Sequence, residues 1–275
     1  MNPDPPDTWS SPFDWLAELD LDPEGTSLQM GTRRLADRPW LIRDDAAAPE
    51  LTLKRRLSDE RPDEVFAPLT TPGVGEAVAA LIEGEGVPLA SVPDGDPLHG
   101  AALSVQEDLC VMARRDGRWV LDGGALHFPS RWSLREKVGR PTVAVHGPVR
   151  GYEERLGARV DGLFDRLTEA PVMRRNWFVH VDDQLFQPFR PQDRLVPAAD
   201  VGSDLVVRSE RQTLRAVAGA VLFTIRVQRA PLSELVARRA AEWRAYVFGA
   251  APDEAVRRGI GVEQLKELRD ASLLG

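Results

Sequence analysis

The stretch AVLFTIRVQ at residues 220–228 decides the fold class, because it is rich in β-branched and apolar residues and predicts a strand. Two more segments extend the prediction outward from it. Residues 204–217, DLVVRSERQTLRAV, are a further candidate strand, and residues 175–182, RNWFVHVD, alternate as a half-buried strand does. The second half of the chain is therefore expected to contain a sheet.

Helical segments interrupt these strands. Residues 231–249 carry Leu232, Leu235 and Val236 on one side and end at Gly249, and residues 154–167 repeat apolar residues at helical spacing. Asp116-Gly117 marks the turn of a hairpin or meander over residues 109–128, a further strand is expected at 142–146, and short helices are expected at 132–139 and 262–273. This mixture predicts an α+β fold.

The first half differs in character. Residues 1–50 are Pro-rich and acidic with scattered tryptophans, which is typical of an extended strap packed on a neighbouring core. Residues 51–66 and 74–83 predict short helices. We therefore divide the chain into an N-terminal strap (1–50), a main domain with helical insertions (51–250) and a C-terminal helical tail (251–275).

Composition excludes several protein classes. The chain has 275 residues and a net charge of -8, which argues against a nucleic-acid binder. A single cysteine, Cys110, excludes a disulfide framework and a Cys-rich zinc site; it lies in an apolar strand and is expected to be a buried, inert thiol. No membrane span and no secretory signal are predicted, so a cytoplasmic location is the expectation.

The common catalytic and nucleotide-binding motifs give no match. GVGEAV at residues 73–78 lacks the third glycine of a dinucleotide loop and follows no predicted strand. The chain contains no phosphate-loop motif, no HExxH and no GxSxG.

Any transition-metal chemistry must draw on four histidines. His99 lies in a turn and is expected at the surface, His127 closes a strand, and His180 is either solvated or lines a cleft. His146 closes the predicted strand TVAVH, on the same side as the small Thr142 and Ala144, which leaves room for a flat ligand such as a porphyrin. From the pattern alone, a buried structural histidine and an iron ligand both stay open, and the structural role is favoured.

Charged residues inside the predicted strands need partners. Residues 208–212, RSERQ, and Arg226 lie among apolar residues, where unpaired charges cost free energy. Two explanations stay open. The charges form a structural ion-pair lattice, or they line a cleft for carboxylates, such as haem propionates, or for a polar substrate.

Several long blocks, in order, resemble one protein family. The most specific is FPSRWSLREKVGRPTVAVHGPV at residues 128–149. Further blocks cover about residues 30–240: KRRLSDERPDEVF (54–66), VQEDLCVM (105–112), VDGLFDRL (160–167), RRNW (174–177), RSERQTLR (208–215) and VLFTIR (221–226). The chain resembles the haem-dependent oxidative N-demethylases, alpha-subunit-like.

The resemblance implies a fold, a cofactor and a reaction. It implies a PAS-like antiparallel sheet with flanking helices and an N-terminal extension, binding haem b. It implies O₂-dependent oxidation of a secondary methylamine to the demethylated amine and formaldehyde. Electrons would come from NADPH through flavin and iron–sulfur partner subunits. The chain itself carries no Cys cluster and no dinucleotide loop, so an external electron-transfer protein is expected.

The resemblance also implies site residues. His146 matches the family's histidine and is the expected iron ligand, and Glu210 and Arg226 match polar positions that would orient a cationic amine or O₂. The expected cofactor-binding residues are Arg175, Asn176, Trp177 and Arg208. His127 departs from the family pattern and is the second choice as ligand.

Two alternatives to an enzyme remain. PAS-like domains often act as sensors, so a haem-based sensor or non-catalytic haem-binding module is the main one. The chain has no coiled-coil linker or output module, which favours the enzyme. The other alternative is a scaffold that has lost haem. The amine, the electron donor and the oligomeric state are not fixed by the sequence.

Overall fold

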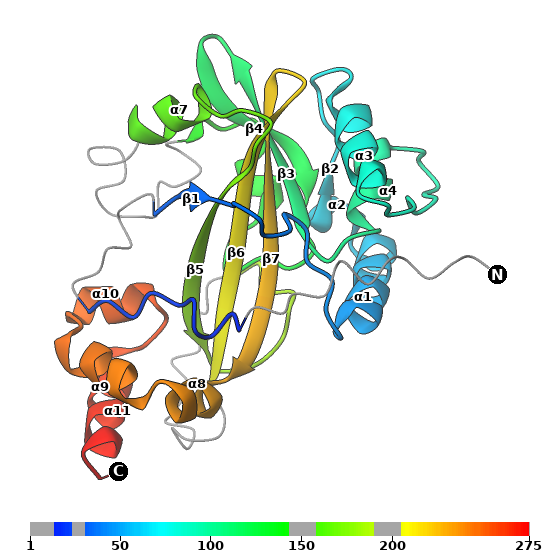
Figure 1. Ribbon diagram of the computed structural model, residues 1–275. Coiled ribbons are helices and arrows are strands. Elements are labelled where there is room, and N and C mark those ends of the chain that lie inside the picture. The colour runs from blue at the N-terminus through cyan, green and yellow to red at the C-terminus, as the bar shows by residue number, and fades with distance from the viewer. Residues whose placement is uncertain (1–13, 24–30, 143–157, 190–204, 275) are drawn as a thin grey trace.

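A seven-stranded antiparallel sheet organises the protein (Figure 1). The computed structural model describes residues 14–23, 31–142, 158–189 and 205–274. The strands lie in the order β1-β5-β6-β7-β3-β4-β2. Their bounds are β1 Arg33–Arg34, β2 Phe66–Ala67, β3 Asp108–Arg115, β4 Arg118–Ala125, β5 Val172–His180, β6 Val206–Val217 and β7 Ala220–Pro231.

The long central strands form where apolar and β-branched residues alternate. β6 and β7 pair over twelve positions, from Val206↔Pro231 to Val217↔Ala220. The expected turn joins β3 and β4, where Asp116 and Gly117 both adopt positive φ (50° and 77°), as the tight hairpin turn requires. The expected strand at 142–146 falls, apart from Thr142, outside the described residues.

Helices cover the sheet and its lower end. They are α1 Ala47–Glu60, α2 Pro62–Val65, α3 Val74–Gly84, α4 Pro97–Ala102, α5 Leu134–Lys137, α7 Ala158–Phe164, α8 Leu232–Arg238, α9 Ala240–Gly249, α10 Pro252–Arg257 and α11 Val262–Leu274. The helix expected over 231–249 divides at Arg239, whose φ and ψ of -135° and 43° are not helical. The prediction of mixed helix and sheet, with an antiparallel sheet and flanking helices, is confirmed.

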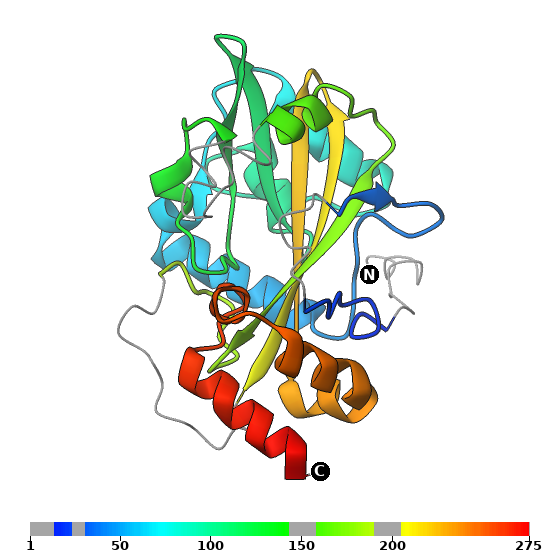
Figure 2. The same cartoon turned by 90° about the vertical axis from the view of Figure 1, so that its left-hand side faces the viewer.

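The sheet has two faces that pack differently. On the front face, towards the viewer in Figure 1, residues 14–23 and 31–46 and helices α8 and α9 cross the strands. Figure 2 shows the same division from the side, with these segments to the right of the sheet and α5 to its left. The side to which α5 belongs is the back face.

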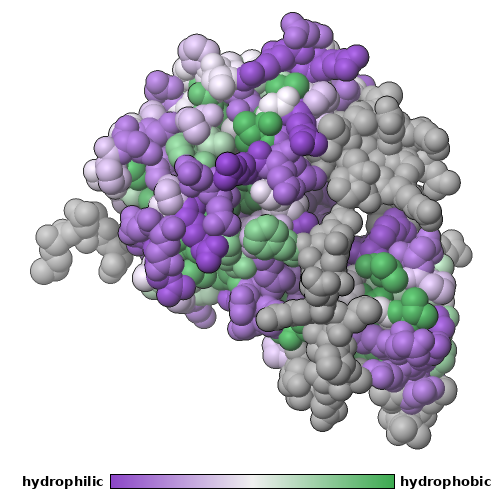
Figure 3. Space-filling model, turned by 180° about the vertical axis from the view of Figure 1, so that it is seen from behind, coloured by the Kyte–Doolittle hydropathy of each residue, from purple (hydrophilic) through white to green (hydrophobic). Residues whose placement is uncertain are grey.

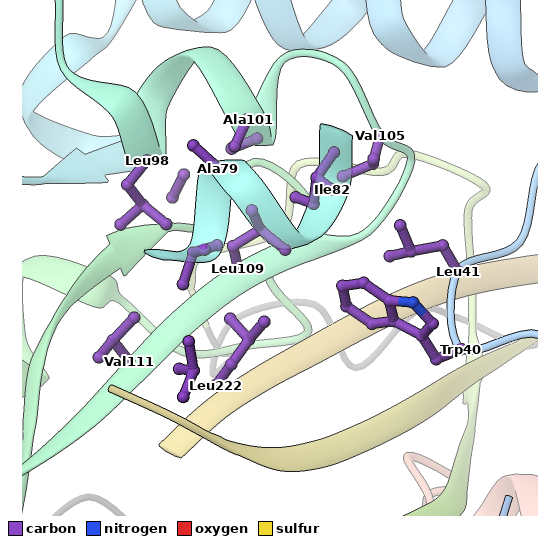
Figure 4. Packing of buried hydrophobic residues seen from close by; sticks show 14 of the residues in the cluster. Trp40, Leu41, Ala79, Ile82, Leu98, Ala101, Val105, Leu109, Val111 and Leu222 are labelled. Carbon is purple, nitrogen blue, oxygen red and sulfur yellow. The ribbon is translucent and has the colours of Figure 1, made fainter. Parts of the chain in front are cut away.

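Three hydrophobic clusters stabilise this arrangement. The upper front cluster packs α3, α4 and Trp40 against the sheet, with Leu109 and Leu222 beneath them (Figure 4). The lower front cluster joins α8–α11 and residues 14–23 to Trp177. The back cluster includes Phe128, Leu134 and Phe164 over Met112 and Val221. On the front face, the polar residues of the central strands lie between the two apolar clusters.

Candidate functional site

Strand register divides the sequence-predicted site residues between the two faces. Residues that pair across an antiparallel ladder point to the same side of the sheet. Asn176 pairs with Glu210, which pairs with Val227 of the back cluster. Arg175 pairs with Arg211, which pairs with Arg226 on the front. Glu210 and Arg226 therefore do not share one pocket, although the sequence analysis placed them together.

The three front-face arginines form a row, and the N-terminal segment supplies most of their partners. Arg175 donates to Glu18 and also to Ser209 and Gln228. Arg211 donates to the backbone carbonyls of Pro39 and Trp40. We call Arg175, Arg211 and Arg226 the arginine row.

Arg226 is the most deeply paired member of the arginine row. Its Nη2 lies 2.7 Å from Asp44 Oδ2 and its Nη1 lies 2.9 Å from Glu50 Oε2, while its side chain is 1% exposed. Gln106 donates to both carboxylates and so links them. This geometry matches the ion-pair lattice, one of the two explanations that the sequence left open.

Trp177 is part of the hydrophobic core. Its ring contacts Trp243 and Tyr246 edge-on in the lower front cluster, and its Nε1 donates to the carbonyl of Asp20. The guanidinium of Arg258 lies 4.6 Å from the ring centroid. These contacts surround the indole with protein. Within the RRNW block, Arg175 and Trp177 face the front, and Arg174 and Asn176, which pair with Gln212 and Glu210, face the back.

The back face carries a buried carboxylate. Glu210 is 6% exposed, and Gln212 Nε2 donates to its Oε2 over 2.8 Å. Within the part of the chain that the structure describes, no cation lies within ion-pair distance of Glu210. Asn176, opposite Glu210, accepts from Arg258 through its Oδ1. We call Asn176, Glu210 and Gln212 the polar band.

Arg208 lies on the back face but is committed to the protein itself. Its guanidinium donates to Ser130 Oγ and to the carbonyls of Gln184, Leu185, Phe128 and Pro129. Burial lowers its pKa to about 10, so it stays a cation at neutral pH. These five acceptors tie the segments around residues 128–130 and 184–185 to β6.

The expected iron ligand, His146, lies outside the described residues. Among the described histidines, His180 has the simplest environment: its Nδ1 lies 2.7 Å from Gln187 Oε1. Gln187 Nε2 donates to Asp182 Oδ1 and to the Gln184 carbonyl, so its oxygen must face the imidazole and accept a proton from Nδ1.

That arrangement leaves His180 Nε2 with its lone pair, buried and without a hydrogen-bond partner in the part of the chain that the structure describes. Burial lowers the pKa of His180 to about 3, so the ring is neutral at physiological pH. Metal-ligating imidazoles commonly have this form, with one nitrogen held by an acceptor and the other open. The alternation of RNWFVHVD placed His180 on the back face but gave no sign that it is buried.

A second polar cluster on the back face was not predicted by the sequence. His127 Nε2 lies 2.9 Å from Ser58 Oγ, and Asp108 accepts the backbone N–H groups of His127 and Phe128. Burial alone would raise the pKa of Asp108, but Lys54, 3.5 Å away, and His127 outweigh it and lower that pKa. His127 has its Nε2 hydrogen-bonded to Ser58, and its buried Nδ1 has no hydrogen-bond partner among the described residues, so it has the same form as His180.

Two further expectations concern metal and thiol chemistry. Cys110 is buried, and burial together with the charges of Asp108 and Glu210 raises the pKa of its thiol, in line with an inert residue. No cluster of three or more His, Cys, Asp or Glu side chains suited to a bare metal ion occurs within the described ranges.

Seen from behind, the surface is mainly hydrophilic, with scattered hydrophobic patches (Figure 3). The described helices include none long and apolar enough to cross a membrane.

The family model for haem-dependent oxidative N-demethylase, alpha subunit-like, matches residues 64–255, a range that includes the polar band, Arg208, His127 and His180. The chain therefore belongs to the haem-dependent oxidative N-demethylase, alpha subunit-like family.

Proposed function

We propose that this protein is a haem-dependent, cytoplasmic oxidoreductase with a PAS-like fold that demethylates a secondary methylamine. The overall reaction takes the methylamine, one O₂, two electrons and two protons to the demethylated amine, formaldehyde and water. The electrons come from an external flavin or iron–sulfur reductase. The membership of the family supports the haem-dependent oxidative class.

One observation supports an amine as the substrate. Glu210 is a buried carboxylate whose hydrogen-bond partner is the neutral amide of Gln212. Among the described residues Glu210 has no direct ion pair, although the charge of Arg208 on the same face acts on it, and a charge-assisted hydrogen bond from an ammonium group would offset the cost of burying the carboxylate. Glu210 therefore binds the protonated amine, and Gln212 and Asn176 orient the carboxylate and the substrate.

Imidazole nitrogens are suitable ligands for haem iron, and the back face carries one in His180 that is buried and has no hydrogen-bond partner among the described residues. Bound haem would supply the activation of O₂. His146 is the residue proposed to hold the haem iron, and His180, with its open and buried Nε2, is the alternative among the described residues. Arg226, Arg175 and Trp177 lie on the front face and Arg208 is fully engaged, so we assign them to supporting the fold rather than the pocket.

Absorption spectroscopy of the full chain, purified and reconstituted with haem, tests this proposal. We expect a Soret band that is lost in His146→Ala and kept in His180→Ala and His127→Ala, with circular dichroism unchanged in all three. Loss in His180→Ala alone would move the ligand to His180. No Soret band in the wild type would refute haem binding.

Turnover then separates the enzyme from the sensor. Titration with secondary methylamines under O₂ and a chemical reductant should shift the spectrum and yield formaldehyde. A haem-loaded protein that neither binds nor consumes any methylamine would support the haem-based sensor instead.

A further inference from the structure

A serine hydroxyl lies between two imidazoles at the edge of the back face. Ser58 Oγ is 2.9 Å from His127 Nε2 and 3.2 Å from His99 Nε2. Ser58 is on α1, His99 is on α4, and His127 directly follows β4. Three separate elements thus bring these side chains together.

Each imidazole also faces a carboxylate with its other nitrogen. His99 Nδ1 is 2.9 Å from Oδ2 of Asp94, whose side chain is 46% exposed. His127 Nδ1 is 3.7 Å from Oδ1 of Asp108, which is beyond hydrogen-bond distance, and this nitrogen has no hydrogen-bond partner among the described residues; both side chains are completely buried. The five side chains therefore run from the protein surface to its interior.

Hydrogen-bond chemistry couples the two imidazoles. The single hydrogen of Ser58 can be donated to only one of them, so the other must donate to the Ser58 oxygen. If His127 Nε2 donates to Ser58, then His127 Nδ1, on the side of Asp108, has no proton. Ser58 in turn donates to His99 Nε2, and the proton of His99 is on Nδ1, on the side of Asp94. If His99 donates, the arrangement is reversed and His127 carries its proton towards Asp108.

We propose that Asp94, His99, Ser58 and His127 form a proton relay that delivers protons from solvent to Asp108 on the back face. The inference rests on the proposed function, whose reaction consumes two protons for each methylamine.

The transfer balances at every step. Asp94, protonated from solvent, gives its proton to His99 Nδ1, and His99 passes the proton on its Nε2 to Ser58. Ser58 passes its own hydrogen to His127 Nε2, and His127 releases the proton on Nδ1 to Asp108 once the 3.7 Å between Nδ1 and Oδ1 of Asp108 closes to a hydrogen bond. One proton enters, one proton reaches Asp108, and each intermediate group regains the number it held.

The inner end of the relay lies close to the polar band. Asp108 pairs with Ile225, and Ile225 pairs with Gln212, so Asp108 and Gln212 share one row of the sheet. Two strand spacings separate them by about 10 Å. The charges of Asp108 and Glu210 both act on Cys110, which lies on this face. A proton at Asp108 therefore lies on the same face as the residues proposed to hold the amine, about 10 Å from them.

Charged groups around the inner imidazole explain why protons pass through it without being stored there. Burial disfavours a positive charge on His127, and the charges of Lys54 and His99 act in the same direction. Together they outweigh Asp108 and lower the pKa of His127 to about 4. At the outer end, the ring of Phe66 stacks on His99 at 4.4 Å and fixes its orientation.

Nuclear magnetic resonance of the haem-free full chain tests the relay without using turnover. The nitrogen resonances of the four histidines report which ring nitrogen is protonated. We expect Asp94→Asn to shift the resonances of both His99 and His127. In the Ser58→Ala background, the same substitution should shift those of His99 alone. Unchanged His127 resonances in Asp94→Asn, or equal shifts with and without Ser58, would overturn the relay.

Turnover measurements form the second arm. In the haem-loaded protein, Ser58→Ala should lower the formaldehyde formed per O₂ consumed at least about tenfold, because positioned proton transfer contributes roughly 100-fold or more. The Soret band and amine affinity should not change, and Ser58→Thr should restore the yield.

Thr52→Ala is the matched control on α1, because Thr52 is exposed and its hydroxyl donates only within the helix. If Ser58→Ala forms as much formaldehyde per O₂ consumed as the wild type, the relay is refuted and the proposed demethylase function is unaffected. If Asp94→Asn shifts the resonances of both His99 and His127 but the haem-loaded protein demethylates no amine, the proposed function is refuted and the relay remains as a proton path.

Discussion

Glu210 and Arg226 lie one register position apart on neighbouring strands and point to opposite faces of the sheet. Arg226 is paired with Asp44 and Glu50, whereas Glu210 has no cation within ion-pair distance among the described residues. The two charges therefore have different environments: the front-face charge holds the N-terminal segment and α1, and the back-face charge is the one that we propose binds the amine.

The first prediction concerns Glu210→Gln. The substitution keeps the shape of the side chain and removes its charge, so the KM for the methylamine should rise about 10- to 100-fold, the equivalent of roughly 1.5–3 kcal/mol for a hydrogen bond to a charged group. Haem content, measured from the Soret band, should not change. Glu263→Gln removes a carboxylate that is 80% exposed on α11 and serves as the control. Equal turnover in wild type and Glu210→Gln would remove Glu210 from the site.

The second prediction concerns Arg226→Gln. Removing the guanidinium leaves the carboxylates of Asp44 and Glu50 without their cation, and breaking a buried ion pair in this way costs about 3–5 kcal/mol. Urea unfolding should show this loss in the free energy of unfolding. Arg229→Gln, on the same strand, should cost less than about 1 kcal/mol, because its partner Asp183 is 79% exposed. Equal losses in the two variants would contradict the structural role of Arg226.

Part of this division could be predicted from the sequence, and part could not. Alternation along β6 already places Arg208 and Glu210 on one face. The relation of Glu210 to Arg226 depends on how β6 and β7 pair, and a shift of one position would put both on the same side. Similarity to a family gave the polar positions but not this register, so both residues were expected in one cleft.

The relay residues show a second limit. Ser58 and His127 are 69 positions apart, and His99 lies on a third element. No spacing rule connects them, because only packing of α1 and α4 against the end of β4 brings them together. The burial of His180 depends in the same way on the segment that carries Gln187, which the strand pattern does not contain.

The third prediction concerns Arg208→Lys. A lysine keeps the charge but has one donor group in place of the planar guanidinium, so it cannot reach the four carbonyls and the hydroxyl that Arg208 binds. Each buried carbonyl left without a donor costs about 1–3 kcal/mol, and urea unfolding should show a loss in that range or above it. Arg114→Lys is the control, since Arg114 binds Asp165 at the surface. If Arg208→Lys lowers the free energy of unfolding no more than the control does, the hydrogen bonds of Arg208 add little stability.

The fourth prediction concerns the pH dependence of stability. The pKa of His127 is about 4 in the folded protein and about 6.5 in the unfolded chain. Above pH 6.5 both states are neutral at this ring and it has no effect. As the pH falls from 6.5 to 4, the unfolded chain binds a proton and the folded protein does not. The free energy of unfolding therefore falls by about 1.4 kcal/mol per pH unit for this group and levels off below pH 4.

Urea unfolding of the haem-free protein at several pH values between 7 and 4.5 measures this slope, and His127→Gln supplies the comparison. His180, with a pKa of about 3, adds a similar slope to both proteins, so the difference between the two slopes isolates His127. The variant should be less stable at pH 7, because its amide replaces the imidazole beside Ser58 and Asp108, but its stability should fall less steeply with acid. Parallel slopes in the two proteins would mean that His127 takes up its proton equally in both states, and the inner end of the relay would then be solvated rather than buried.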